Sequence, residues 1–213
     1  MISPINPAAV MAGIQFTFDH SGICGMPRAY PTYPYTEPGS PGFTDEEIQA
    51  IIDDLLAQET QFSVNDGGPL DTLCRALNVD VEYSDKPNEI LLDVPLDRRA
   101  VIWLPKNGKP RHDRLATACG IGHWLLHVPH TREICPGMGI QALYDPTDAA
   151  LSEEARRFAF ELLMPTDKFK SLWYEGRAQL CAETLNVPTQ AVYDRAKCLT
   201  LSQTPDFAPP TPS

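Results

Sequence analysis

The first clear amphipathic pattern of the chain follows Thr44. Apolar residues recur at helical spacing through the next turns, at Ile48, Ile51, Ile52, Leu55 and Leu56. Thr44 can cap this helix, and acidic residues at positions 45–47 fill its first turn, where negative charge suits the helix dipole. We therefore predict a helix that begins at residue 45.

Similar patterns predict the other elements. Helical spacing indicates a second helix opening at Pro69, and further helices at about 112–128, 150–164 and 166–198, the last broken near 186–188. Alternating apolar residues predict a strand over 79–83, and two more strands are expected at 90–95 and 100–105. The order of helix, small sheet and then helices predicts the α+β class.

Proline marks the boundaries of the folded region. Seven of the 21 prolines precede residue 42, and residues 27–42 show neither helical nor strand periodicity. We expect residues 1–43 to form a proline-rich arm that is extended or poorly ordered. Residues 44–68 should form an acidic helix and linker, residues 69–203 one domain, and residues 204–213 a disordered tail.

The charge is strongly acidic and unevenly distributed. The net charge is −11, and residues 1–68 hold nine acidic residues but one basic residue, Arg28. Direct DNA binding is not expected, because phosphate contacts need a basic surface. The short cluster Lys106, Lys109, Arg111 and Arg114 fits a solvated loop that leads into a helix better than a phosphate site. No apolar run is long enough to span a membrane, and the six cysteines form no CxxC pair, so we expect a reduced, cytoplasmic protein.

The stretch RLATACGIGHWLLH at residues 114–127 has the frame of a zinc-peptidase helix. In H-E-x-x-H, two histidines on one helical face bind zinc, and the glutamate activates the metal-bound water. Here Cys119 stands at the first histidine position, Gly120 at the glutamate position and His123 at the second histidine position. This stretch alone is one histidine on a helix and does not establish a metal site.

A second stretch, LSEEARRFAFELLMP at residues 151–165, adds the missing context. Together the two resemble the ImmA/IrrE family of zinc metallo-endopeptidases, whose members carry R-F-T-x-A-H-E-x-G-H-x-x-x-H followed by E-A-x-x-F-A-x-x-L-L-M-P. Residues 69–79 and 180–195 resemble the opening helix and the closing helix-turn-helix-like element of that family. The resemblance covers roughly residues 69–198.

The resemblance implies a zincin-like domain in which a small twisted sheet packs on a bundle of helices, with a helix-turn-helix-like element at the C-terminal end. Family members commonly act beside a helix-turn-helix (Xre-like) repressor, often in prophages or mobile elements. A protein partner of that kind is therefore expected. The charge of the closing element is nearly balanced, so it favours packing over DNA reading.

The resemblance also assigns roles where residues match. His123 corresponds to the second zinc histidine and Glu154 to the third ligand, with Glu153 a weaker candidate. Cys119 replaces the first histidine, and its thiolate is a good zinc ligand. Gly120 replaces the general base, a loss that typically slows such a step by roughly 100- to 10,000-fold. No residue is therefore assigned as catalytic.

Two interpretations of these residues stay open. His123 and Glu154 form either a zinc site or a buried hydrogen-bonded pair, and Cys119 is either a ligand or a small buried residue. His127 is expected to be structural, although a histidine pair at positions 123 and 127 has metal-binding spacing.

The resemblance and the replaced residues leave three alternative functions. The first, which we favour, is a catalytically impaired homologue that regulates a repressor by protein–protein interaction. The second is an active zinc endopeptidase that cleaves the repressor. The third is a metal-free interaction module of a toxin–antitoxin-like pair.

Overall fold

The computed structural model describes residues 34–58, 66–84, 89–106 and 109–201, all within one compact unit of the chain. Its centre is a mixed five-stranded sheet in the order β1-β5-β3-β4-β2. Strand β3 runs antiparallel to both of its neighbours, whereas β2 and β4 are parallel, as are β1 and β5. The strands are β1 (Tyr35–Thr36), β2 (Val79–Ser84), β3 (Ile90–Val94), β4 (Ala100–Pro105) and β5 (Gly139–Leu143).

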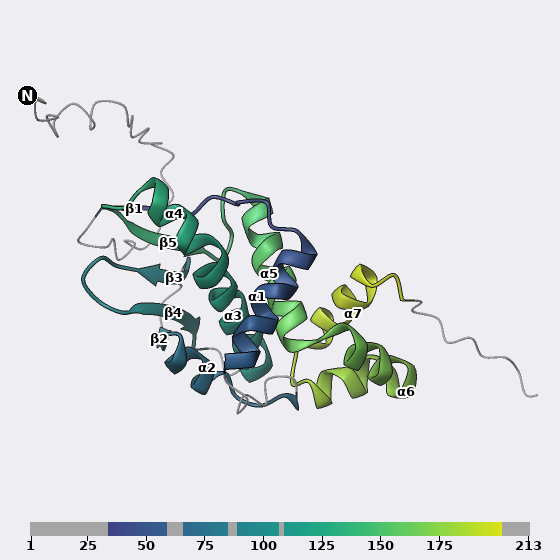
Figure 1. The fold of residues 1–213 in the computed structure, drawn as a ribbon. Coiled ribbons are helices and arrows are strands. Elements are labelled where there is room, and N and C mark those ends of the chain that lie inside the picture. The colour runs from purple at the N-terminus through teal and green to yellow at the C-terminus, as the bar shows by residue number, and fades with distance from the viewer. Residues whose placement is uncertain (1–33, 59–65, 85–88, 107–108, 202–213) are drawn as a thin grey trace, which may run out of the picture. The chain divides into compact units, whose positions relative to one another are not determined.

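The sheet is combined with helices, which confirms the α+β class and is compatible with a zincin-like domain. They are α1 (Asp45–Gln58), α2 (Asp71–Ala76), α3 (Pro110–Gly122), the π-helical η4 (His123–His127), α4 (Val128–Ile134), α5 (Ala149–Leu163), α6 (Thr166–Thr184) and α7 (Thr189–Cys198). In Figure 1, α3 lies against the sheet, α5 lies beside α3, and α6 and α7 lie beyond α5. None of the helices in the described segments is long and apolar enough to cross a membrane.

The predicted cap of the first helix is confirmed. The backbone N–H of Glu47 donates to Thr44 Oγ1 at 3.2 Å, and the N–H of Thr44 donates to Glu47 Oε2 at 2.8 Å. These two bonds form a capping box, which satisfies two backbone donors at the start of α1. The apolar stripe of α1 packs on α5, with Ile48 and Ile52 buried.

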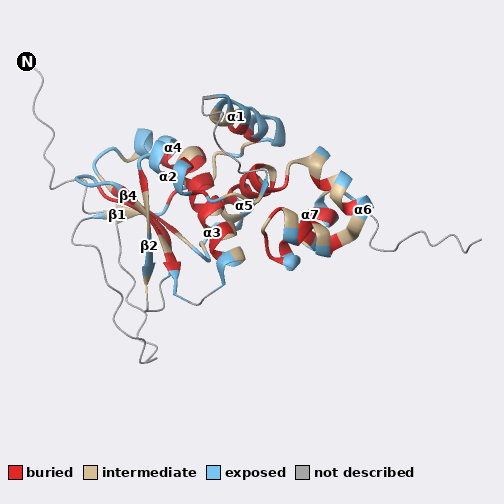
Figure 2. Ribbon diagram, turned by 90° about the horizontal axis from the view of Figure 1, so that it is seen from below, coloured by how far each residue is buried: buried red, intermediate tan, exposed pale blue. Residues whose placement is uncertain are grey.

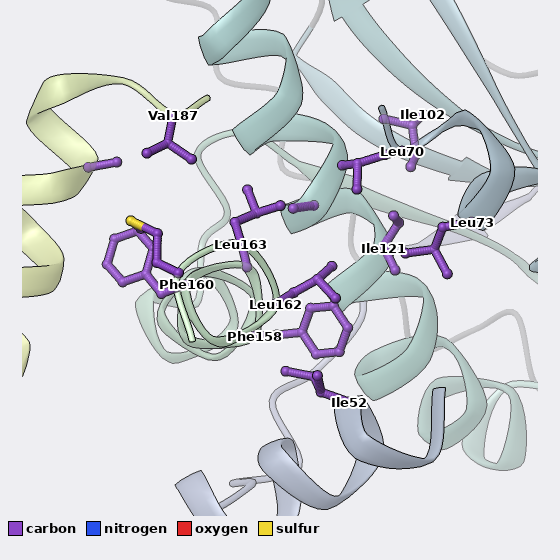
Figure 3. Close-up of a cluster of buried hydrophobic side chains, with 14 of the residues drawn as sticks. Ile52, Leu70, Leu73, Ile102, Ile121, Phe158, Phe160, Leu162, Leu163 and Val187 are labelled. Atoms are coloured by element: carbon purple, nitrogen blue, oxygen red, sulfur yellow. The ribbon is translucent and has the colours of Figure 1, made fainter. Parts of the chain in front are cut away.

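One apolar core runs between the sheet and the helices, and the buried positions gather there in Figure 2. On the sheet side of this core, Ile102 of β4 and Ile121 of α3 lie near Leu73 of α2 (Figure 3). Phe158 of α5 points toward Ile52 of α1, whereas Phe160 lies on the side of the C-terminal helices α6 and α7. Helix α5 is therefore in contact with apolar groups from several directions.

The structure divides the helix expected at 112–128 into α3, η4 and α4, which ends at residue 134. The division has a local cause, because Pro129 has no N–H to donate and its ring clashes with the preceding turn. The N–H of Val128 instead donates to the carbonyl of His123, five residues earlier. The chain therefore makes one π turn just before the proline.

Two strands were not predicted. Strand β5 lies between α4 and α5, so the order of helix, sheet and then helices is too simple. Strand β1 lies in the predicted proline-rich arm, where the N–H of Gly139 donates to the carbonyl of Pro34 at 2.9 Å. Residues 1–33 and 202–213, which hold most of that arm and all of the predicted tail, lie outside the described residues.

Arg114 lies in the expected helix but is not solvated, which corrects that part of the interpretation of the basic cluster. It is buried in α3, and its guanidinium donates to the carbonyl of Gly68. The side chain therefore joins α3 to the segment before α2 and is not part of a solvated loop.

Candidate functional site

The candidate residues lie on two neighbouring helical segments. Cys119 and Gly120 lie in α3, His123 opens η4, and Glu154 lies in the middle of α5. The residues His123 and Glu154 are both buried. The pairing of α3 with α5 thus brings the two sequence stretches together in the interior.

His127 lies between His123 and Glu154 in a chain of hydrogen bonds. Its Nδ1 is 2.9 Å from Nδ1 of His123, and its Nε2 is 2.9 Å from Oε2 of Glu154. The sequence analysis expected Glu154 beside His123, but the structure places the carboxylate against His127. The spacing of 123 and 127 and the nearby Pro129 were the signals that could have indicated this contact.

The bonds assign one proton to each imidazole ring. A carboxylate only accepts, so His127 donates through Nε2–H to Glu154 and accepts at Nδ1 from the Nδ1–H of His123. Burial lowers the pKa of His123 and the pKa of His127, so both rings are neutral at pH 7. Neutral rings fit this arrangement, because each has one donor and one acceptor.

Cys119 and His123 also line a cleft of about 290 Å³. Its walls are largely apolar and include Leu115 of α3 and Leu143 of β5, with Tyr144 and Arg156 also lining it. Glu154 is not among the lining residues, and Glu153 is exposed and paired with Arg156. The carboxylate expected as third ligand therefore does not face the same space as the thiol.

This arrangement does not fit a zinc ion. A catalytic zinc site needs three protein ligands around one point and one open position. Within the described segments, no group of three or more His, Cys, Asp or Glu side chains is arranged to hold a metal ion. Glu154 bonds to His127, and Cys119 lines the cleft, so the donors are directed to different places.

Thiol chemistry at the cleft is also disfavoured. Burial raises the pKa of the Cys119 thiol to about 12 and lowers the pKa of His123. A cysteine nucleophile needs the opposite shifts, which yield a thiolate beside a protonated imidazole. Cys119 and His123 thus form a neutral wall of the cleft.

Gly120 faces the sheet. A Cβ placed on this residue would lie 2.8 Å from two side-chain carbons of Ile102 and 3.1 Å from a third. Such distances are shorter than the contacts that real Cβ atoms make. Helix α3 therefore approaches β4 so closely that only glycine fits at position 120 without a shift of its neighbours. At the position that carries the general base in the family pattern, the space for a side chain is therefore occupied by Ile102.

Comparison with known proteins agrees with the sequence resemblance. The family model described as the IrrE N-terminal-like domain matches residues 74–197, more than half of the chain. The matched range includes α3, η4, α5 and most of α7, and therefore every candidate site residue. No curated protein matches the chain.

Proposed function

Because the chain belongs to the metallopeptidase family of the IrrE N-terminal-like domain, we propose that it is a catalytically impaired member that regulates a helix-turn-helix repressor, or a similar partner, by protein–protein interaction. The observation that carries this proposal is Gly120. It replaces the general base, and its contact with Ile102 leaves no room for a side chain. The rest of the domain, including a well-packed core, is retained.

The cleft supports the same proposal. Cys119 and His123, which line it, are neutral at the place where a peptidase needs an activated nucleophile. Such a cleft can still hold a peptide segment, since apolar pockets bind side chains without reacting with them.

Helix α1 offers a surface that suits a basic partner. Glu46, Asp53 and Asp54 are exposed on it, and no basic residue lies in its last turn. A repressor that reads DNA carries a basic face. Opposite charges of this kind accelerate and orient association more than they strengthen it.

The test is to purify the tagged full-length chain under gentle lysis and to identify retained helix-turn-helix proteins by mass spectrometry. A retained repressor is then purified, mixed with the chain, and followed for binding and for cleavage. We expect a stable complex in which the repressor stays intact. The absence of any retained helix-turn-helix protein would count against this partner.

Other outcomes support the alternatives. Cleavage that disappears in Glu154→Ala would indicate an active zinc endopeptidase. A different partner, bound equally well by Cys119→Ser and His123→Ala, would indicate a metal-free module of a toxin–antitoxin-like pair.

Paired charge reversals locate the interface. The double substitution Glu46→Lys and Asp54→Lys should weaken repressor binding by roughly tenfold at low salt, and less at high salt. The control is Glu133→Lys with Asp145→Lys, which reverses two exposed charges outside α1. Equal effects of both pairs would show that net charge, and not α1, controls binding.

A further inference from the structure

The interior of the site contains an unbroken chain of polar groups from one helix to another. It runs from His123 through His127 in η4 to Glu154 in α5. We propose that this chain is a metal-independent cross-link, which joins η4 to α5 where the resemblance places a zinc ion. The inference concerns what holds the site together, so it is independent of which partner the protein binds.

The use of the ring nitrogens supports the cross-link. Both nitrogens of His127 are occupied, one by His123 and one by Glu154, each at 2.9 Å. Nδ1 of His123 is occupied by the same contact. A metal ion could bind His127 only by breaking one of these hydrogen bonds, because both of its ring nitrogens are used.

Burial makes these bonds important for stability. The exposed fraction of the His127 side chain is 0%, and that of Glu154 is 4%. A buried carboxylate without a partner is strongly destabilising, because it has lost its hydration. His127 is the partner that compensates for this loss of hydration. The nearby Thr131 does not bind the carboxylate through this bond, because its hydroxyl donates to the carbonyl of His127.

The backbone is shaped for the same contact. The π turn over residues 123–127 contains both histidines and precedes Pro129. π turns are uncommon and are often found at functional sites. Here the turn gives His127 a position from which one ring reaches both neighbours.

The test combines metal analysis with a double-mutant cycle on the full-length chain. Zinc per chain is measured by elemental mass spectrometry, and thermal unfolding is followed with one equivalent of Zn²⁺ and with EDTA. We expect far less than one zinc per chain, and a Tm that neither addition changes. Cys119→Ser should leave both results unchanged.

The cycle uses His127→Leu, Glu154→Leu and the double substitution. His127→Leu should raise the equilibrium constant for unfolding roughly 100-fold, because it leaves Glu154 buried without its partner. The double variant should unfold no more readily than His127→Leu, since it removes both polar groups together. If His127→Leu does not fold but the double variant does, the result also shows that Glu154 is destabilising without its partner.

Three results would overturn the proposal. The first is one zinc per chain that is lost in Cys119→Ser or His123→Ala, which would establish a metal site at the expected residues. The second is one zinc that is lost in His127→Leu but kept in Cys119→Ser, which would establish a shifted metal site. The third is additivity of the two leucine substitutions, which would show that His127 and Glu154 do not stabilise each other.

Discussion

Single residues in this protein affect chemistry and packing together, and Gly120 is the clearest example. In the family pattern its position supplies a proton-transfer group, whereas here it allows α3 to approach Ile102 of β4. Any side chain at this position would enter a fully packed part of the core. A glutamate at this position would therefore disturb the packing between α3 and β4.

We predict that Gly120→Ala lowers the free energy of unfolding by about 1–2 kcal/mol, although alanine favours helices by about 1 kcal/mol. Gly120→Glu should lower it further and yield no peptidase activity. Urea unfolding measures both effects. Gly39→Ala is the control, because no atom lies within 4 Å of an added Cβ there. A Gly120→Ala variant as stable as Gly39→Ala would contradict the packing argument.

The two buried histidines predict a dependence of stability on pH. Burial lowers the pKa of His123 and of His127 from the ordinary value of 6.5, so the unfolded chain binds more protons at mildly acidic pH. Their contribution is therefore fully present above pH 6.5 and is lost as the pH falls below it. Each histidine should contribute a slope of up to about 1.4 kcal/mol per pH unit.

Urea unfolding between pH 7.5 and 5 measures this slope. The double substitution His123→Asn and His127→Asn should flatten it, even if the variant is less stable throughout. A free energy of unfolding that stays constant or rises toward pH 5 in the wild type would contradict the prediction.

At the scale of elements, two helices depart from regular geometry for different reasons. The π turn of η4 follows from Pro129, as described above. Helix α6 instead contains a kink, where Gly176 has φ −139° and Arg177 has φ 58° and ψ −155°. That conformation is strained for a residue with a side chain and is nearly free for glycine. The guanidinium of Arg177 lies 6.0 Å from the Trp173 ring, which offsets part of the strain.

Substitutions on the two sides of this kink should have opposite effects. Arg177→Gly should raise the free energy of unfolding by about 0.5–1 kcal/mol, because relief of strain exceeds the added freedom of the unfolded chain. Gly176→Ala should lower it, because a Cβ would lie 2.6 Å from Cβ of Leu180. Thermal unfolding of both variants measures the difference. Destabilisation by Arg177→Gly would show that the side-chain contact outweighs the strain.

At the scale of the whole molecule, α5 connects the other parts. It contacts α3 and α1, and at its C-terminal end Glu161 accepts a hydrogen bond from Arg195 of α7 at 2.6 Å. Arg195 also donates to Thr166 at the start of α6, at 2.9 Å. This largely buried pair fixes the closing helices to the helix that carries Glu154. The closing element therefore has a packing role in this fold.

Arg195→Ala should lower the free energy of unfolding by about 3 kcal/mol, because it leaves Glu161 poorly hydrated and without its charged partner. Lys197→Ala, on the exposed side of the same helix, should change it by less than about 0.5 kcal/mol. Denaturant unfolding of the two variants makes the comparison. If they are equally stable, the pair does not hold α7 in place.

The local elements and the family could be predicted from the sequence, because their signals are local. The capping box at Thr44, the apolar stripe of α1 and the alternation in β2 each depend on neighbouring residues. The family motifs also placed Cys119, Gly120, His123 and Glu154 on the helices where they are found. Strand β5 gave no such signal, because the polar Gln141 interrupts its apolar positions and its first four residues are buried only in the assembled fold.

The sequence by itself determined the α+β class, the family and the presence of Gly120 at the position of the family's glutamate, since residue type and spacing along the chain suffice for these. Only the tertiary structure decided which groups meet. His127 meets Glu154 across the two helical segments, and the approach of α3 to Ile102 closes the space at Gly120. Both results depend on how the helices pack in three dimensions, because a small shift or rotation of a helix changes which groups its buried side chains contact.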